Sequence, residues 1–227
     1  MSLSATPMAE IDFLSSLHTR TKRDYVQRVV EHDKAECAEV AKRWGFDYWD
    51  GDRKYGFGGY AYDGRWRPVA EKMAAHYGLK AGDRILDIGC GKGFLLHEFT
   101  LAVPGIEVAG IDVSEYAIQH AKDEVRPHLR VGSATELPWP NGHFDFVYSL
   151  NTFHNLKNFE LMAALKEMQR VGKKNRYICV ESYRNEREKA NLLYWQLTCE
   201  TFFAPDEWFW FFDRAGYEGD AGFIYFE

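Results

Sequence analysis

Short apolar runs alternate with stretches of helical periodicity from about residue 67 onwards. Residues 84–88 read Arg-Ile-Leu-Asp-Ile, an apolar run that predicts a buried parallel strand. A glycine-rich turn follows, and then residues 94–99 place apolar side chains on one face of a helix. Further strands are predicted at 106–111, 129–131, 144–150, 177–180 and 223–226, with helices at 67–77, 114–121, 159–169, 185–201 and 205–216. This alternation predicts an α/β fold with a mostly parallel sheet.

The first third of the chain lacks this alternation. Residues 10–44 carry apolar side chains at helical spacing, and a break near 18–21 predicts two helices, the second capped by Thr21 with Asp24 three residues on. Residues 44–66 then interleave nine aromatic residues with glycines and charges, which suits neither helix nor strand. They form either an irregular loop held to the surface by its aromatics or, as long loops usually do, a functional cover over a bound ligand. We expect an N-terminal unit of helices and aromatic cap loop, 1–64, and a core, 65–227.

The glycine-rich turn contains residue types that point to a ligand. Its sequence is Asp87-Ile-Gly-Cys-Gly-Lys-Gly93, and glycine lets backbone N–H groups and a helix N-terminus approach a polar group. A dinucleotide fingerprint requires glycine or alanine where Phe94 stands, so that pattern fails. The acid at the strand end would repel a pyrophosphate but suits a cationic amine.

A second acid, Asp112, ends the next predicted strand. An acid at this position accepts hydrogen bonds from both hydroxyls of a ribose. A cationic amine joined to a ribose describes S-adenosylmethionine. The alternative, a nucleotide-binding fold whose glycines serve only packing, leaves both acids unexplained.

Three motifs in order carry a resemblance to a known family. Asp87 to Gly93, Gly110-Ile-Asp-Val-Ser114 and Phe144-Asp-Phe-Val-Tyr-Ser149 resemble the class I S-adenosylmethionine-dependent methyltransferases over about residues 65–227. The resemblance implies a Rossmann-like, doubly wound, seven-stranded, mostly parallel sheet with an N-terminal helical cap. It also implies S-adenosyl-L-methionine as cofactor and S-adenosyl-L-homocysteine as product.

The resemblance and the residue types assign a cofactor site. Relatives commonly place an acid after the glycine of the third strand to bind the adenine amine, and here Ser133 stands there. Its hydroxyl accepts a hydrogen bond, or the Ala134 backbone takes this role. The predicted cofactor-binding residues are Asp87, Gly89, Cys90, Gly91, Gly93, Asp112, Val113, Ser133, Ala134, Asn151 and Tyr60.

Two titratable residues follow the ends of the fourth and fifth predicted strands, where open α/β sheets bind ligands. His154 is a candidate general base because only histidine titrates near neutrality without perturbation; the alternative is a histidine that holds its loop. Glu181 faces the same crevice as a base or as a ligand for a hydroxyl or amine, or forms a salt bridge with Arg184 or Arg187.

Residues for the methyl acceptor are expected in the aromatic loop and after the fifth strand. Residues 55–66 resemble, more loosely, small-molecule methyltransferases of bacterial surface-polysaccharide and biosynthetic clusters, which implies a small sugar-linked or phosphorylated acceptor. Arg65 is a candidate for a carboxylate or phosphate, or it is a surface charge. Tyr62, Tyr183 and Trp195 complete the predicted acceptor set. No metal ligands recur at helical spacing, so no metal site is expected.

Composition narrows the range of binding partners expected for this chain. The 227 residues carry a net charge of −6, which makes a nucleic-acid backbone a poor partner. The four cysteines show no C-x-x-C spacing and are expected to be reduced thiols of a cytoplasmic protein. No apolar run has the length of a membrane span, so no membrane is expected as a partner. Aromatic residues make up 16% of the chain, and this surplus makes a homodimer possible.

These observations predict an enzyme that methylates oxygen or nitrogen of a small molecule, with carbon methylation left open. Two alternatives come from other classes. One is a catalytically silent cofactor-binding or interaction subunit, with Trp208 and Trp210 as an exposed partner surface. The other is a nicotinamide-dependent oxidoreductase, which the residue at position 94 disfavours.

Overall fold

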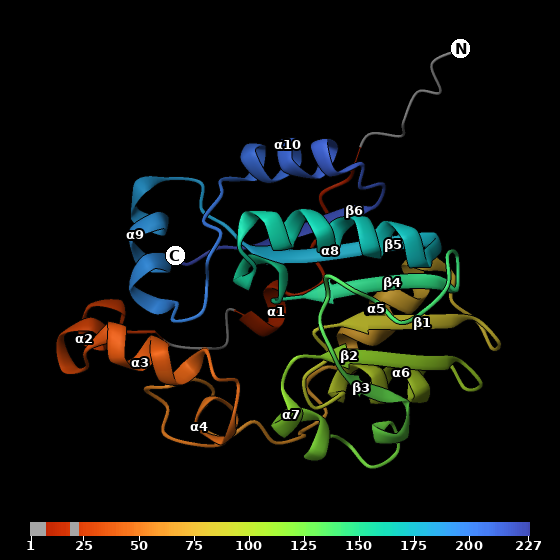
Figure 1. Ribbon diagram of the computed structural model, residues 1–227, viewed down its shortest axis with the longest axis horizontal. Coiled ribbons are helices and arrows are strands. Elements are labelled where there is room, and N and C mark those ends of the chain that lie inside the picture. The colour runs from red at the N-terminus through yellow and green to blue at the C-terminus, as the bar shows by residue number, and fades with distance from the viewer. Residues whose placement is uncertain (1–7, 19–22) are drawn as a thin grey trace.

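The predicted strands pair into one six-stranded sheet of order β3-β2-β1-β4-β5-β6, in which every neighbouring pair is parallel. The structure is a computed structural model that describes residues 8–18 and 23–227 (Figure 1). The strands are β1 (Arg84–Ile88), β2 (Glu107–Asp112), β3 (Leu129–Val131), β4 (Phe144–Leu150), β5 (Gly172–Glu181) and β6 (Asp220–Ile224). The α/β, Rossmann-like class is confirmed. Seven strands were expected, and six form within the described residues.

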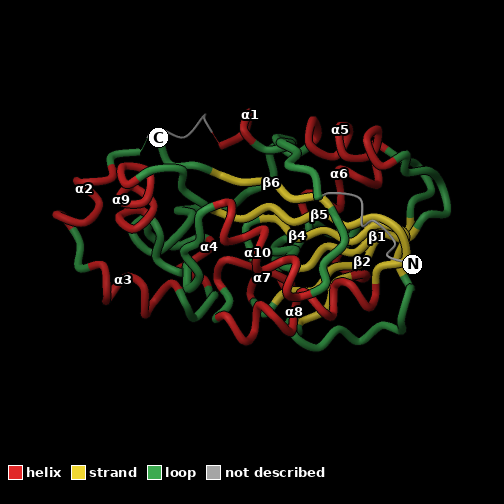
Figure 2. Tube along the Cα trace, turned by 90° about the horizontal axis from the view of Figure 1, so that it is seen from above, coloured by secondary structure: helices red, strands yellow, loops and turns green. Residues whose placement is uncertain are grey.

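Helices cover both faces of the sheet. They are α5 (Arg67–Tyr77), α6 (Phe94–Ala102), α7 (Glu115–Gln119), α8 (Asn158–Val171), α9 (Glu186–Trp195) and α10 (Pro205–Ala215), with short 3₁₀ turns η1 (Arg126–His128) and η2 (Phe153–Asn155). Figure 2 shows α5 and α6 on one face, and Figure 1 shows α8 and α10 on the other. Strand side chains alternate accordingly, because Ile85 packs with the α5–α6 core and Leu86 with the α8–α10 core.

One helix is shorter than its apolar pattern predicted. The helix expected over 185–201 ends as α9 at Trp195. The backbone N–H groups of Glu200 and Thr201 instead donate to the carbonyl oxygen of His154, at 2.9 and 3.0 Å. This long-range contact outweighs the local helical pattern and ties the segment after α9 to the carboxyl end of β4.

Two helices were expected over residues 10–44, and the described part of this stretch forms three: α1 (Ser15–His18), α2 (Tyr25–Glu31) and α3 (Lys34–Ala41). A further short helix, α4 (Phe46–Trp49), lies within the aromatic stretch that was expected to be irregular. Thr21, the expected cap, lies outside the described residues. Asp24 caps α2 by accepting from the N–H of Gln27, and Asp33 caps α3. In Figure 1, α2, α3 and α4 lie beyond the end of the sheet from which β5 runs into α9, and α2 packs against α9.

The segment before α1 is joined to the sheet. The N–H of Ala221 in β6 donates to the carbonyl of Ala9, and the N–H of Ile11 donates to the carbonyl of Ala221. This parallel bridge covers the open edge of β6. Phe13 follows and is 6% exposed, with its ring 5.0 Å from that of Tyr177 in an edge-on arrangement. The division of the chain at residue 64 stays a prediction.

Two further expectations concern side chains. Trp208 was expected on an exposed partner surface but is fully buried between α10 and the sheet, while Trp210 is 62% exposed. All four cysteines are buried free thiols. Within the described ranges, no helix has the length and apolar character needed to cross a bilayer.

We expect Phe13→Ala to lower the free energy of unfolding by about 3 kcal/mol, because it leaves a cavity where a buried ring packs on the sheet. Urea denaturation measures this value. The control is Phe159→Ala, since Phe159 is 71% exposed and its loss should change stability little. Equal effects of the two substitutions would show that residues 9–14 detach from the sheet in solution.

Candidate functional site

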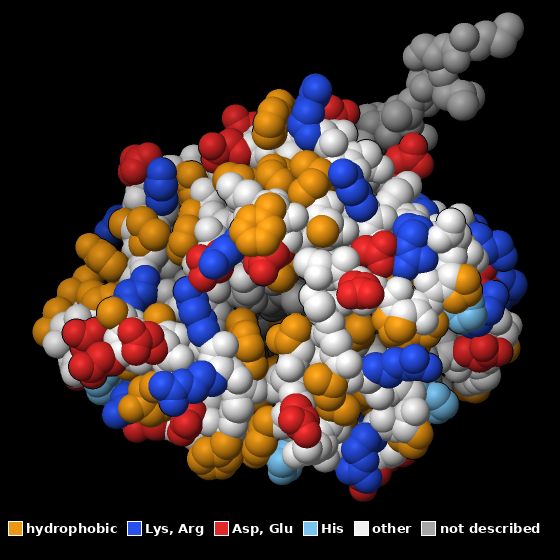
Figure 3. All heavy atoms as spheres, in the orientation of Figure 1, with side chains coloured by type: hydrophobic (Ala, Val, Ile, Leu, Met, Phe, Trp, Pro, Cys, Tyr) orange, Lys and Arg blue, Asp and Glu red, His pale blue; other side chains and the backbone are white. Residues whose placement is uncertain are grey.

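A cavity of about 490 Å³ lies at the carboxyl ends of β1, β2 and β4. Two glycines of the turn after β1 line it, with φ angles of 84° at Gly89 and 52° at Gly91. A Cβ at Gly89 would come within 2.0 Å of the Thr152 hydroxyl oxygen, and one at Gly91 within 2.8 Å of the Trp49 ring. Both the backbone angle and the close approach therefore require glycine. Figure 3 shows a hollow near the middle of this face of the molecule.

Ten of the eleven predicted cofactor residues line this cavity: Asp87, Gly89, Cys90, Gly91, Asp112, Val113, Ser133, Ala134, Asn151 and Tyr60. The exception, Gly93, lies at the start of α6 with a φ of 69°. A Cβ there would approach side-chain atoms of Val125 and Leu129 to about 3 Å. Gly93 is therefore required by the turn and by packing, and it does not line the cavity.

The two strand-end acids place two buried carboxyl groups on the cavity wall. Asp87 is 5% exposed, and its burial, with the nearby carboxylate of Asp112, raises its pKa well above the ordinary value. Burial also raises the pKa of Asp112, although its carboxylate accepts hydrogen bonds of 2.8 Å from the N–H groups of Gly91 and Ser114. Among the described residues, neither acid pairs with a lysine, arginine or histidine. The cavity wall is therefore suited to a cationic ligand.

The aromatic loop lies over this cavity. The ring of Trp49 stacks on that of Phe57 with centroids 5.3 Å apart, and Tyr60 stacks on Phe94 at 5.0 Å. The indole N–H of Trp49 donates to the hydroxyl of Ser114, which follows β2. The loop thus presents aromatic faces to the cavity, as its functional interpretation requires.

A buried lysine that the sequence analysis missed holds this loop in place. Lys92, inside the glycine turn, is 5% exposed, and its ammonium donates to both carboxylate oxygens of Asp50, at 2.8 and 2.6 Å, and to the carbonyl of Tyr60, at 2.9 Å. Asp50 also accepts from the Tyr60 N–H and from the Tyr116 hydroxyl. Lys92 stands within the recognised motif, but no sequence spacing links it to a partner 42 positions earlier.

A second cavity of about 290 Å³ adjoins the first and contains both catalytic candidates. The Nε2 atom of His154 lies 3.4 Å from Oε2 of Glu181, and the backbone N–H of Glu181 donates to His154 Nδ1 at 3.3 Å. The side-chain amide of Gln196 donates to the other carboxylate oxygen. The two cavities share His18, Tyr48, Phe57, Tyr60, Arg65, Asn151, Asn155 and Ile224 as lining residues.

Burial acts in opposite directions on this pair. It lowers the pKa of His154 to about 3 and raises the pKa of Glu181 to about 8. Because Nδ1 of the neutral ring accepts a backbone N–H, the hydrogen-bond pattern assigns the ring proton to Nε2, which faces the carboxyl group of Glu181. His154 then has no free lone pair and holds its loop and the glutamate. Of the two, Glu181 is the group that titrates near neutrality.

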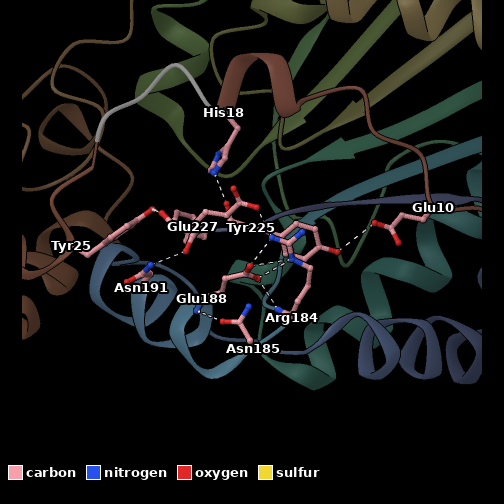
Figure 4. Close-up of polar contacts among 10 residues, drawn as sticks. Glu10, His18, Tyr25, Arg184, Asn185, Glu188, Asn191, Tyr225 and Glu227 are labelled. Atoms are coloured by element: carbon pink, nitrogen blue, oxygen red, sulfur yellow. Dashed lines mark hydrogen bonds and ion pairs between the residues drawn. The ribbon is translucent and has the colours of Figure 1, made fainter.

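The alternative salt bridge for Glu181 is wrong. Figure 4 shows the guanidinium of Arg184 between the carboxylates of Glu188 and Glu227, 2.6 and 2.5 Å away. It also lies over the ring of Tyr225, 4.1 Å from its centroid. This cluster is separate from the carboxyl group of Glu181.

The structure brings two of the four predicted acceptor residues to the site. Trp195 lines the second cavity, and Arg65 lines both cavities but forms an ion pair of 2.6 Å with Asp63. The hydroxyl of Tyr62 instead donates to the buried carboxylate of Glu98, and Tyr183 does not line either cavity. Within residues 8–18 and 23–227, no three or more His, Cys, Asp or Glu side chains lie close enough together to hold a metal ion.

Residues 85–175 match the family model of a methyltransferase domain. The chain carries a class I S-adenosylmethionine-dependent methyltransferase domain. The match spans the strands β1, β2, β3 and β4 together with the glycine turn, so both strand-end acids belong to the methyltransferase domain.

Curated relatives match the methyltransferase domain over part of their length. The 27-O-demethylrifamycin SV methyltransferase of Amycolatopsis mediterranei is 34% identical over 39% of this chain and 35% of its own. A demethylmenaquinone methyltransferase of Symbiobacterium thermophilum is 31% identical over 52% of this chain and 50% of its own. The chain thus spans half or less of the length of these relatives.

Solved structures share the fold. A chain from the complex between a methyltransferase activator and a methyltransferase of Haloferax volcanii aligns with a TM-score of 0.55 and 22% identity over 86% of this chain and 77% of that one. The YcgJ protein of Bacillus subtilis aligns with a TM-score of 0.52 and 20% identity over 64% of this chain and 66% of its own. At these identities the likeness concerns the fold of the methyltransferase domain.

We expect Lys92→Met to lower the free energy of unfolding by roughly 3 kcal/mol, because it leaves Asp50 without its cation in a partly buried position. The aromatic loop should also open, so that trypsin cleaves after Arg53 or Lys54 several-fold faster. Lys166→Met, on the exposed face of α8, is the matched control. Unchanged cleavage in Lys92→Met would show that other contacts hold the loop.

The pair of Glu181 and His154 predicts a pH effect on stability. A carboxyl group with a folded-state pKa of about 8 stabilises the fold fully below its unfolded value, about 4.3, and this contribution is lost as the pH rises to about 8. The free energy of unfolding of the wild type should therefore fall relative to that of Glu181→Gln between about pH 5 and 8.

Urea denaturation at several pH values measures the difference. The control is Glu186→Gln, which changes an exposed glutamate of α9 and should follow the wild-type curve. Parallel curves for Glu181→Gln and the wild type would contradict a buried, protonated carboxyl group.

Proposed function

We propose that this chain transfers a methyl group from S-adenosylmethionine to an oxygen or nitrogen atom of a small acceptor molecule. The observation that carries the proposal is the pair of strand-end acids, Asp87 and Asp112, in a cavity lined by glycine and joined to a second cavity with a titratable glutamate. The methyltransferase family match supports the donor.

The residues of the first cavity fit this donor. Asp87 is suited to its cationic amine and Asp112 to its ribose hydroxyls, which would relieve the cost of two buried acids without a cation. The Ser133–Ala134 segment lies along the same wall. The aromatic loop excludes water and offers aromatic faces to a positive sulfur.

The donor supplies a methyl group already activated by its sulfonium, so the protein must mainly align the acceptor and keep water out. Asn151 has a φ of 56°, an unfavourable conformation for a residue other than glycine, and it lines both cavities. It is therefore placed to orient an acceptor at the junction. The ionised form of Glu181, held by His154 and Gln196, takes the proton if the acceptor is a hydroxyl group.

The acceptor class is inferred from the relatives and from the lining of the second cavity. The relatives named above are methyltransferases of demethylrifamycin and demethylmenaquinone, two small molecules, and they share only part of this chain. A sugar-linked or phosphorylated acceptor agrees with the arginine-rich lining of the second cavity.

Binding of S-adenosylhomocysteine, measured by calorimetry and by thermal shift, tests the proposal. At about 100 times its Kd the product should raise the free energy of unfolding by about 2.7 kcal/mol. Asp112→Ala should weaken binding roughly 10- to 100-fold, because it removes a charged acceptor of hydrogen bonds. Asp213→Ala, on the exposed side of α10, should bind like the wild type.

Nicotinamide dinucleotides serve as the opposing ligands in the same assay. Stabilisation by NADH and none by S-adenosylhomocysteine would overturn the methyltransferase proposal in favour of the oxidoreductase. Equal affinity of Asp112→Ala and the wild type for S-adenosylhomocysteine would overturn the placement of the donor.

A further inference from the structure

Three arginine side chains gather around one indole ring at the second cavity. The guanidinium carbons of Arg28, Arg23 and Arg53 lie 4.6, 5.4 and 5.6 Å from the centre of the Trp195 ring. They come from the start of the N-terminal helical region and from the aromatic loop, and all four side chains line the cavity. No local sequence pattern indicates this cluster, because its members are separated by up to 172 positions.

Two members of this cluster, Arg28 and Arg53, have no carboxylate beside them among the described residues. The Nε of Arg28 donates to the carbonyl of Trp195 at 3.0 Å, and Nη1 of Arg53 donates to the carbonyl of Gly56 at 2.5 Å. Over the described ranges, Arg28 and Arg53 form no ion pair with a carboxylate, whereas Arg65 pairs with Asp63. Burial and the repulsion between the two guanidinium groups lower the pKa of Arg28.

An arginine remains charged at every physiological pH, so the cluster retains its mutual repulsion. Carbonyl oxygens and an aromatic face offset part of this cost, but several guanidinium N–H groups of Arg28 and Arg53 have no hydrogen-bond acceptor among the described residues. An anion in the cavity would accept hydrogen bonds from these N–H groups and offset the repulsion between the guanidinium groups.

The acid in the same cavity does not oppose an anion. Burial raises the pKa of Glu181 to about 8, so its carboxyl group is protonated near neutral pH. Its Oε2 atom is buried and has no hydrogen-bond partner among the described residues apart from the His154 ring nitrogen 3.4 Å away. The second cavity therefore presents positive charge at the arginine cluster and a neutral carboxyl group at Glu181.

We propose that Arg28 and Arg53, with Arg23 beside them, bind a phosphate group of the methyl acceptor, and that this anchor places the acceptor's nucleophilic atom beside Glu181. The inference rests on the proposed function and names its substrate class. A phosphate dianion carries about two charges and three acceptor oxygens, which matches two or more guanidinium groups. A single carboxylate is matched by one guanidinium fork.

Inorganic phosphate is the probe, titrated calorimetrically into the full chain at low ionic strength with and without S-adenosylhomocysteine. The wild type should bind phosphate, and Arg28→Gln and Arg53→Gln should each weaken it by about tenfold or more, equal to about 1.4 kcal/mol. Arg214→Gln is the matched control, because Arg214 also lies over an indole, that of Trp210, but pairs with Asp213 far from the cavity. Its affinity for phosphate should not change.

S-adenosylhomocysteine binding separates the two proposals. If the arginine variants retain the wild-type affinity for S-adenosylhomocysteine but lose phosphate, the variants are folded and the anion site is supported. If the wild type binds S-adenosylhomocysteine but not phosphate, or if both arginine variants bind phosphate like the wild type, the anion site is wrong while the proposed function stands. Malonate that binds as tightly as phosphate, with the same loss in both variants, would overturn the phosphate assignment.

Discussion

The buried ammonium of Lys92 is the interaction on which the shape of the site depends. An ammonium group removed from water requires an acid, and Asp50 provides it from the aromatic loop. The same carboxylate accepts hydrogen bonds from Tyr60 and Tyr116, so one contact joins the glycine turn, the loop and the helix after β2. Without it, the loop would depend on weaker contacts such as the hydrogen bond from Trp49 to Ser114 to hold its aromatic rings over the first cavity.

The two adjoining cavities differ in the sign of their charge. Asp87 and Asp112 make the first acidic, and Arg28 and Arg53 make the second basic. The proposed cationic donor and phosphorylated acceptor would therefore be drawn to different sides of the Asn151 junction, which would limit the wrong orientation of either molecule. Burial adds a second distinction, since it keeps His154 neutral and brings the pKa of Glu181 near the physiological range. Desolvation and hydrogen bonding together decide which of the two side chains is able to exchange a proton.

Much of the core was predictable from local pattern. The strands ending at Asp87-Ile88 and Asp112, and the glycines between them, are specified by short apolar runs and by backbone angles that only glycine tolerates. The N-terminal helices were less predictable, because Asp33 starts a new helix within one continuous helical pattern. The length of α9 was also mispredicted, since its end depends on hydrogen bonds to His154 in a distant loop. The sixth strand is paired on its outer edge by residues 9–11, which no local pattern indicates.

The amino-acid sequence by itself determined the class of fold, the turn that approaches the proposed donor and the identity of its two acids. These features are local, because a strand, a turn and the residue at a strand end are set by neighbours in the chain. Only the tertiary structure decided that Arg65 is paired with Asp63, that His154 is neutral beside Glu181, and that Arg28 and Arg53 meet at Trp195. The physical reason is that charge, burial and pairing depend on atoms brought together from distant segments, and the spacing of residues along a chain does not record those distances.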